Sequence, residues 1–342
     1  MHSSDRIVMT TSATSTTSPE FDLIARHFTR PARRGVLGIG DDCALLDVTP
    51  GKQLAVSTDT LVSGVHFFAD TDAHMLGHKA LAVNLSDLAA MGASPRYCTL
   101  AITLPQIDDA WLGDFARGLF GLADQYDVVL IGGDTTRGPL SMTLTVMGQV
   151  APGRALQRDH AHAGDDIWIS GALGGAAMAL RHLRDGMVLP MQHVQTALMR
   201  LHMPQPRIAL GLRLSGLAGA EIAAIDVSDG LVADLGHICT RSGLGAEIDW
   251  QKIPLHPALL AEYENTRMAC ALAGGDDYEL CFTAPPSRRA AIAAMADDMA
   301  LPLSLIGAMT TGNAVVVRDA QGGAIKVPTA GFDHFARASA KK

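Results

Sequence analysis

The chain has 342 residues, 48% of them hydrophobic and 18% charged, which is enough apolar material for the cores of two ordinary domains. A formal net charge of −8, with Lys and Arg scattered along the chain, argues against nucleic acid or an anionic membrane as a partner. No apolar run approaches the ~20 residues that a membrane-spanning helix needs, and five widely spaced cysteines without a CxxC pair favour a reducing cytoplasm.

Residues 1–19 are rich in Ser and Thr and are predicted to form a disordered leader outside the fold. The periodicity of apolar residues then predicts an α/β domain over residues 20–150. Its expected elements are helices over 21–28, 74–92 and 108–126, and strands over 97–105 and 141–150. Two further segments, 52–60 and 128–136, are each expected to be a strand that runs into a loop.

Turn residues and charges at 152–166 place a domain boundary near residue 151, and a second α/β domain is predicted over residues 151–342. Its expected strands cover 166–171, 222–227 and 246–250, with a final strand pair at 303–317. Helices are expected over 175–184 and 207–217, from 231, and near 287–299. A Pro- and His-rich connection is expected at 189–206 and a loop at 273–285.

The segment IAAIDVSDGL at 222–231 ends a predicted buried strand with two carboxylates three residues apart. Taken alone, this pattern is more simply explained by Ser228 or Asp229 capping the following helix. However, Asp beside Gly, Ser or Thr next to an apolar segment recurs in GIGDDCALL (38–46), STDTLVSG (57–64), NLSDLAAMG (84–92), IGGDTTRG (131–138) and AGGDDYEL (273–280). Six such motifs together favour a ligand site.

If the aspartates of these motifs converge, their repulsion raises several pKa values unless cations are bound. The six candidates are Asp42, Asp59, Asp87, Asp134, Asp226 and Asp229. Oxygen-only ligation, without His or Cys at zinc spacing, favours Mg²⁺ or Mn²⁺. Because Mg²⁺ usually binds a few carboxylates together with substrate phosphates, the sequence predicts metal-assisted phosphate chemistry.

Basic residues near these motifs are few. Lys79 precedes the Val83–Asp87 segment by one helical turn, whereas Arg137 and Arg158 are candidate phosphate contacts. His66 is the one histidine beside an acidic motif. The chain lacks GxxxxGK[ST], HExxH and GxSxG, and the glycines of SGALGG (170–175) are explained equally well by tight packing and by a phosphate cradle.

Taken in order, the motifs GIGDDCALL, STDTLVSGVHF, HKALAVNLSDLAAMGASP, LIGGDTTRGPLSMT, IDVSDGL and GGDDYELCF resemble those of the thiamine-monophosphate kinase family, from about residue 20 to GFDHF at 331–335. The resemblance implies an α/β (α+β) two-domain ATP-binding fold, shared with aminoimidazole-ribonucleotide synthetase and selenophosphate synthetase. A ligand cleft between the domains and a homodimer formed through the first domain are also implied. The implied reaction converts ATP and thiamine monophosphate to ADP and thiamine diphosphate with several Mg²⁺ ions, the last step of thiamine diphosphate biosynthesis.

The resemblance also implies three groups of site residues. The implied metal ligands are Asp42, Ser57, Thr58, Asp59, Asp87, Asp134, Asp226 and Asp229. The implied nucleotide contacts are Gly133, Asp134, Arg158 and Ser228, and the substrate contacts are His66, Asp276 and Phe332. Position 276 departs from the family, which usually has Glu there. Because the acceptor phosphate is already anionic, direct in-line transfer without a general base is expected.

Two other functions remain open on the sequence. A synthetase of the same superfamily would activate an amide or a selenium nucleophile, and the selenium enzymes resemble a pattern with a reactive Cys or selenocysteine in a mobile N-terminal segment. The nearest cysteine here is Cys43, inside GDDCA. A non-catalytic nucleotide sensor would be expected to have lost some carboxylates, and here every implied metal position is filled.

Overall fold

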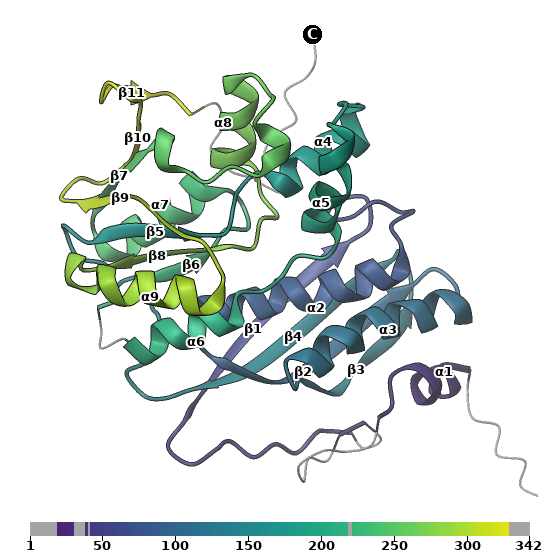
Figure 1. Cartoon of the computed structure of the whole chain (residues 1–342). Helices are drawn as coiled ribbons and strands as arrows, with labels where there is room; N and C mark the ends of the chain where they lie inside the picture. Colours follow the sequence, from purple (N-terminus) through teal and green to yellow (C-terminus); the bar gives the residue numbers. More distant parts are fainter. Residues whose placement is uncertain (1–18, 31–37, 40–41, 218–220, 328–342) are drawn as a thin grey trace, which may run out of the picture.

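The structure, a computed structural model, describes residues 19–30, 38–39, 42–217 and 221–327 (Figure 1). Residues 1–18 of the predicted leader, and Phe332, lie outside this part of the chain. The described residues form two β-sheets with helices on their faces, as expected for the mixed α/β class. No helix in these ranges is both long and apolar enough to cross a membrane.

The first sheet has four strands in the order β1-β4-β2-β3 and is covered on one face by helices. Its strands are β1 (Gln53–Val62), β2 (Ser94–Leu104), β3 (Val129–Arg137) and β4 (Ser141–Val150). The helices of this half are α1 (Pro19–His27), α2 (Ala73–Ala90) and α3 (Asp109–Gln125). On β1, Leu61 is buried whereas Leu54 and Val56 are exposed, because alternate side chains point to opposite faces.

The second sheet has seven strands in the order β11-β10-β7-β9-β5-β8-β6. Its strands are β5 (Asp166–Ser170), β6 (Ala224–Asp226), β7 (Gly245–Asp249), β8 (Leu280–Ala284), β9 (Leu303–Thr310), β10 (Val315–Arg318) and β11 (Ala324–Ile325). The helices are α4 (Gly175–Asp185), α5 (Met191–His202), α6 (Ile208–Leu217), α7 (Leu231–Ser242), α8 (Glu264–Ala273) and α9 (Arg289–Met299). Most of these elements lie where sequence periodicity predicts them.

Helix α2 is buried on nearly all sides because it packs against both halves of the molecule (Figure 1). On β8, Phe282 points into the apolar core that contains the α2 side chains, whereas Cys281 points into the core on the other face of the sheet. Close approach to α3 requires Gly77, since a Cβ there would lie 2.0 Å from the Phe115 carbonyl oxygen. One of the two apolar cores therefore extends across both domains, and the other lies within the second domain.

Several local predictions were wrong or incomplete. The loops expected at the ends of 52–60 and 128–136 are parts of strands β1 and β3, which continue to Val62 and Arg137. The expected connection at 189–206 contains helix α5, whose flanking Pro190 and Pro204 bound the helix rather than break it. Strand β8 lies inside the expected loop at 273–285, because its apolar run follows directly on a Gly- and Asp-rich turn. Helix α8 was not predicted, and it carries one wall of the pocket described below.

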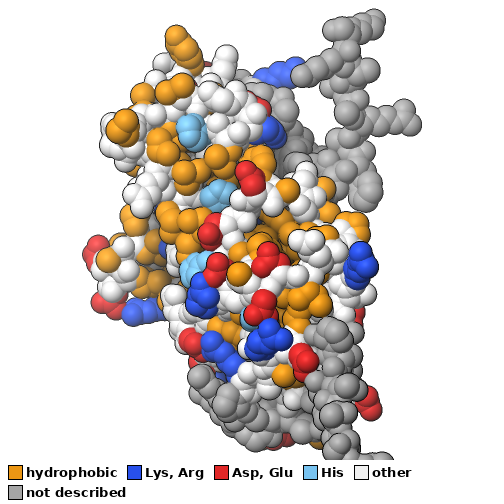
Figure 2. All heavy atoms as spheres, turned by 90° about the vertical axis from the view of Figure 1, so that its right-hand side faces the viewer, with side chains coloured by type: hydrophobic (Ala, Val, Ile, Leu, Met, Phe, Trp, Pro, Cys, Tyr) orange, Lys and Arg blue, Asp and Glu red, His pale blue; other side chains and the backbone are white. Residues whose placement is uncertain are grey.

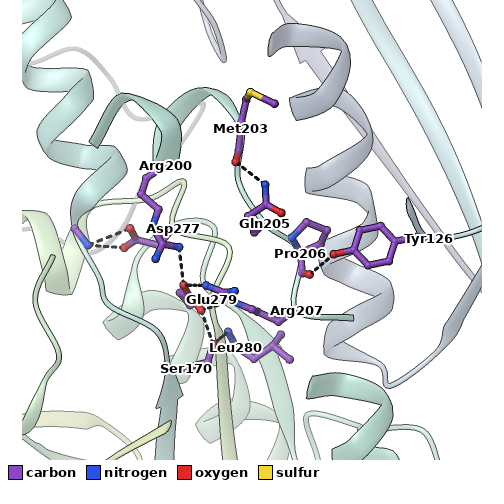
Figure 3. A network of polar contacts seen from close by, with 11 residues as sticks. Tyr126, Ser170, Arg200, Met203, Gln205, Pro206, Arg207, Asp277, Glu279 and Leu280 are labelled. Carbon is purple, nitrogen blue, oxygen red and sulfur yellow. Dashed lines mark hydrogen bonds and ion pairs between the residues drawn. The ribbon is translucent and has the colours of Figure 1, made fainter. Parts of the chain in front are cut away.

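The segment 203–207 between α5 and α6 is fixed to the first half of the molecule by two backbone carbonyls. The Pro204 carbonyl oxygen lies 2.9 Å from Nε2 of the buried His78 on α2. The Pro206 carbonyl oxygen accepts a hydrogen bond of 3.2 Å from the Tyr126 hydroxyl (Figure 3). This segment therefore has a defined position on the first domain.

The same segment is fixed to the second domain through Glu279, whose side chain is fully buried (Figure 3). Arg207 and Arg200 both pair with this carboxylate, and the Arg200 Nη1 to Glu279 Oε1 distance is 2.8 Å. The Ser170 hydroxyl donates a further hydrogen bond of 2.6 Å to it. Two cations and a hydroxyl thus compensate the cost of burying this charge.

Candidate active site

A pocket of about 780 Å³ lies where the two domains meet, and it is lined by residues of both. The first domain contributes β1, the loop that follows it, and one face of α2. The second contributes α4, α5, α8, the residues after β6 and the loop before β8. Eight sequence-predicted site residues line the pocket: Thr58, Asp59, His66, Asp87, Asp226, Ser228, Asp229 and Asp276.

The first-domain carboxylates are held by contacts between β1 and α2. The Ser57 hydroxyl donates a 2.5 Å hydrogen bond to Asp87, and the Asp59 backbone N–H donates to the buried Asn84 amide oxygen at 3.1 Å. Ser57 and Asp59 share the helix-facing side of the strand, two residues apart, so both can meet α2. Thr58 points to the opposite, open face, where its hydroxyl lies 2.8 Å from that of Thr145.

The second-domain carboxylates follow the buried end of β6, in a turn organised by Asp234 of α7. One oxygen of the Asp234 carboxylate accepts hydrogen bonds from the backbone N–H groups of Ser228, Asp229 and Gly230, at 3.0, 3.1 and 3.1 Å. Gly230 has a positive φ of 121°, which few other residues tolerate. Asp234 therefore fixes the turn that presents Asp226, Ser228 and Asp229 to the pocket.

Four of the five pocket aspartates, Asp59, Asp87, Asp226 and Asp229, repel one another in the absence of cations. Burial raises the pKa of Asp59 to about 6, and the charges of Asp87 and Asp229 add to this rise. Burial also raises the pKa of Asp226 to about 8, again with a contribution from Asp87. The pKa of Asp87 itself is raised by burial, although the Ser57 hydrogen bond and the Arg158 charge act against the rise. Such a cluster favours the binding of positive charge.

On the other side of the pocket, Lys79 of α2 forms an ion pair with Asp276, with 3.1 Å between Nζ and Oδ2. The Tyr278 hydroxyl donates a hydrogen bond of 3.1 Å to the other Asp276 oxygen. Asp276 and Tyr278 both have positive φ, 67° and 49°, a conformation that costs energy in residues other than glycine. Nearby, His66 accepts a 3.0 Å hydrogen bond from the Val62 N–H through Nδ1.

One face of the molecule brings acidic, basic and histidine side chains close together, with hydrophobic side chains among them (Figure 2). This mixture matches the pocket lining, which combines carboxylates with Phe67, Phe68 and Leu180. A ligand with both charged and apolar parts suits such a lining.

Several predicted residues do not line this pocket. Asp42 is exposed before β1, and Arg158 is exposed too, although its charge influences Asp87. Asp134 and Gly133 are exposed on β3, at the opposite edge of the sheet from β1.

The position of Asp134 follows from the strand register. Asp134 on β3 pairs with Ala101 on β2, which pairs with Thr143 on β4, and Thr143 in turn pairs with Thr60 on β1. Residues paired in this way point to the same side of a sheet, so Asp134 and Thr60 lie on the same open face. Three strand spacings separate them, about 14 Å. Within one subunit, the sheet therefore keeps Asp134 away from the pocket carboxylates.

Three residues that position the site were missed from the sequence: Asn84 as the partner of β1, Asp234, and Tyr278. Asp234 had a local signal, because an acidic residue in the first turn of a helix often accepts from nearby N–H groups. In SGALGG, the Gly174 N–H donates to both oxygens of buried Asp277, at 3.0 and 2.8 Å, and a Cβ at Gly171 would collide with Glu279. The packing interpretation of that motif is therefore favoured.

The donor set fits a hard cation that a phosphate ligand helps to coordinate. In the described ranges, no three Asp, Glu, His or Cys side chains form a ready metal site. Mg²⁺ typically takes one or two carboxylates together with waters and substrate phosphates, so a complete set of protein ligands is not required. Asp59, Asp87, Asp226 and Asp229 supply oxygen donors on two sides of the pocket.

Two families of known proteins match the chain. "AIR synthase related protein, N-terminal domain" matches residues 40–150, and "AIR synthase related protein, C-terminal domain" matches residues 162–320. The chain is also 48% identical over 324 residues to thiamine-monophosphate kinase of Escherichia coli K12, covering 93% of this chain and 98% of the relative.

Solved structures agree with this similarity. The crystal structure of thiamine-monophosphate kinase from Stenotrophomonas maltophilia is similar with a TM-score of 0.79 and 49% identity, covering 89% of this chain and 96% of that one. A structure of AaThiL complexed with AMPPCP and TMP is similar with a TM-score of 0.73 and 29% identity, covering 84% and 89%. The similarity therefore extends over both domains.

Proposed function

Because the chain belongs to the thiamine-monophosphate kinase family, we propose that the pocket between its domains is the site where it phosphorylates thiamine monophosphate to thiamine diphosphate with ATP. The observation that carries this proposal is the pocket itself, in which four aspartates from both domains face the Lys79–Asp276 pair. A relative of known structure holds AMPPCP and TMP together, which supports a site for both substrates.

The chemistry requires positioning and charge neutralisation rather than a base. A phosphate oxygen of thiamine monophosphate attacks the γ-phosphorus of ATP, a new P–O bond forms, the bond to the β,γ-bridging oxygen breaks, and ADP leaves. Asp59, Asp87, Asp226 and Asp229 are proposed to hold Mg²⁺, with Ser57, Thr58, Asp42 and Asp134 assisting. When bound, Mg²⁺ supplies positive charge that offsets the repulsion between the reacting phosphates.

The organic parts of the substrates are assigned to the remaining residues. Ser228 and Arg158 are proposed to contact the nucleotide, together with Gly133 and Asp134 of strand β3. His66 and Asp276 are proposed to contact thiamine monophosphate, together with Phe332. His66 is supported by its place in the pocket lining beside Phe67 and Phe68. The synthetase alternative would need a reactive Cys in the N-terminal segment, and the nearest one there, Cys43, is exposed and does not line the pocket.

We propose domain limits of 20–150 and 151–342, supported by the membership of the two sheets. A cytoplasmic location is supported by the free state of all five cysteines.

A homodimer formed through the open face of the first sheet is proposed as well. This face exposes Leu54 by 42% and Val56 by 57%. A two-fold axis along the strands would set β3 of one subunit over β1 of the other, and would bring Asp134 of the partner subunit to the pocket.

Val56→Glu is expected to shift the mass measured by sedimentation equilibrium from that of a dimer to that of a monomer, because it places a charge on the proposed interface. A wild-type monomer at micromolar concentration would contradict the proposal.

The activity is tested by incubating the protein with ATP, Mg²⁺ and thiamine monophosphate and detecting thiamine diphosphate by chromatography. Excess EDTA is expected to lower the rate at least ~100-fold, because a loss of several kcal/mol of charge stabilisation corresponds to that factor or more. ATP with a chiral γ-phosphorus should give product of inverted configuration. Absence of thiamine diphosphate, full activity in EDTA, or retention would each contradict one part of the proposal.

A further inference from the structure

We propose that Lys79 is a further catalytic residue of this kinase, and that its ammonium group binds the acceptor phosphate of thiamine monophosphate. This inference rests on the function proposed above. It concerns the one lysine that lines the pocket among the described residues, and it assigns the Lys79–Asp276 pair a joint role in recognising the substrate.

The position of Lys79 on α2 supports this role. Lys79, Val83 and Asp87 are spaced by four residues and all line the pocket, so they share one face of the helix. Eight residues separate Lys79 from Asp87, about 12 Å along the helix axis. The lysine and the carboxylate cluster therefore bracket a space that has room for the γ-phosphoryl group and the acceptor phosphate between them.

The burial of Lys79 also requires an explanation. Its side chain is 3% exposed, and its one ion-pair partner in the described chain, Asp276, has a side chain that is 31% exposed. An ammonium has three N–H donors, and Asp276 accepts one of them. A buried charge is costly unless it is well paired. A second anion that enters the pocket would pair with the Lys79 ammonium and offset that cost.

The other cations of the pocket are less suited to the task. Arg181 and Arg184 line it from α4 of the second domain, not from the helix that carries Asp87. The Arg184 side chain is 58% exposed and already pairs with Asp185 at 3.0 Å. Lys79 is instead connected through Asp276 to Tyr278, the residue whose pKa is raised by burial and also by the charges of Asp276, Asp226 and Asp59.

The charges of the pair complement those of the substrate. Thiamine monophosphate carries a cationic thiazolium ring joined by a short chain to an anionic phosphate. An ammonium and a carboxylate held 3.1 Å apart present the opposite charges side by side. In this arrangement Asp276 faces the thiazolium ring and Lys79 faces the phosphate that attacks ATP.

Thiamine lacks the phosphate, so comparing its binding with that of thiamine monophosphate distinguishes the role of Lys79 from that of Asp276. By isothermal titration, Lys79→Met is expected to weaken thiamine monophosphate at least tenfold and to change thiamine less than twofold. Asp276→Asn is expected to weaken both ligands. In turnover, Lys79→Met should lower kcat at least 100-fold with KM for ATP within threefold of wild type, and Lys79→Arg should recover most of that loss.

A double variant distinguishes contact with the phosphate from support of Asp276. Lys79→Met alone leaves the Asp276 carboxylate without its partner and should lower Tm. Lys79→Met/Asp276→Asn removes both charges, so its Tm should return toward that of wild type, while its kcat should stay as low as that of Lys79→Met. If the double variant instead regains the kcat of Asp276→Asn, Lys79 acts only as a structural partner and the inference is wrong. Equal weakening of thiamine and thiamine monophosphate by Lys79→Met would overturn it as well.

Lys252 offers a matched control, because it forms a 3.3 Å ion pair with Asp249 outside the pocket. Lys252→Met should leave both ligand affinities and kcat unchanged. Activity and binding measurements on the wild-type protein distinguish a failure of this inference from a failure of the proposed function. If it makes thiamine diphosphate, the function stands whatever Lys79 does, and if it binds neither ligand, the function and the inference both fail.

Discussion

Replacing Asp226 with asparagine is expected to lower kcat by about 10²–10³-fold while raising the thermal stability of the metal-free protein. The loss of activity follows because an amide is a far weaker ligand for Mg²⁺ than a carboxylate. The gain in stability follows because Asp226 is only 5% exposed and lies beside other acidic groups. An uncharged side chain of the same shape removes that repulsion.

The stability difference should grow with pH. The pKa of Asp226 is raised by burial from 3.8 to about 8, so the folded protein keeps a proton that the unfolded chain releases. The contribution of protonated Asp226 to the free energy of unfolding of the wild type is therefore fully present below pH ~4, and it is lost as the pH rises toward 8. Because asparagine does not titrate, the Tm advantage of the variant in EDTA should be larger at pH 8 than at pH 5.

Differential scanning calorimetry in EDTA at both pH values, with steady-state kinetics in Mg²⁺, measures these effects. Asp297→Asn is the control for stability, because Asp297 is exposed on α9 outside the pocket and its loss should change Tm little. A variant of Asp226 that unfolds more easily than wild type at pH 8, yet keeps its kcat, would show that the carboxylate is structural.

Glu279→Ala is expected to lower the free energy of unfolding by about 3 kcal/mol, because it leaves two arginines without their shared partner. The Arg200 and Arg207 side chains are 28% and 17% exposed, so water compensates only part of the loss. The Ser170 hydroxyl loses its acceptor too. Urea unfolding followed by circular dichroism measures the change.

Asp298 provides the matched control, because it forms an ion pair of 2.9 Å with Arg213 in which both side chains are at least 48% exposed. Asp298→Ala should cost less than about 1 kcal/mol. If Glu279→Ala costs no more than this control, the buried network contributes little to holding the segment between α5 and α6, and the explanation given for it is wrong.

The sequence predicted the α/β class and most elements because their apolar periodicity is local. It also indicated Asp59, Asp87 and Asp226, since each belongs to a short motif in which Asp stands close to Ser or Thr at an element that the pattern already located. The location of Asp134 in the fold could not be predicted in this way. Its motif resembles the others, but strand order is set by pairings across the whole domain, and β3 lies at the far edge of its sheet.

Other features depended on contacts that no short stretch of sequence contains. The partners of Glu279 come from α5, from the segment before α6 and from β5, up to 109 residues away in the chain. Similarly, the role of Lys79 depends on Asp276, which is 197 residues distant. A lysine on a predicted helix is usually a solvated surface residue, so only the tertiary structure distinguishes this one.

The shared packing of α2 has a consequence for how the chain is made. Synthesis on the ribosome delivers α2 well before α6, whose Gly211 packs so closely that a Cβ there would lie 2.0 Å from the Ala89 carbonyl oxygen. Until α6 and β8 have emerged, the apolar surface of α2 that they cover has no native partner in the nascent chain. During that interval the surface is a natural target for chaperones, and a stall in translation between residues 150 and 208 would leave an aggregation-prone intermediate.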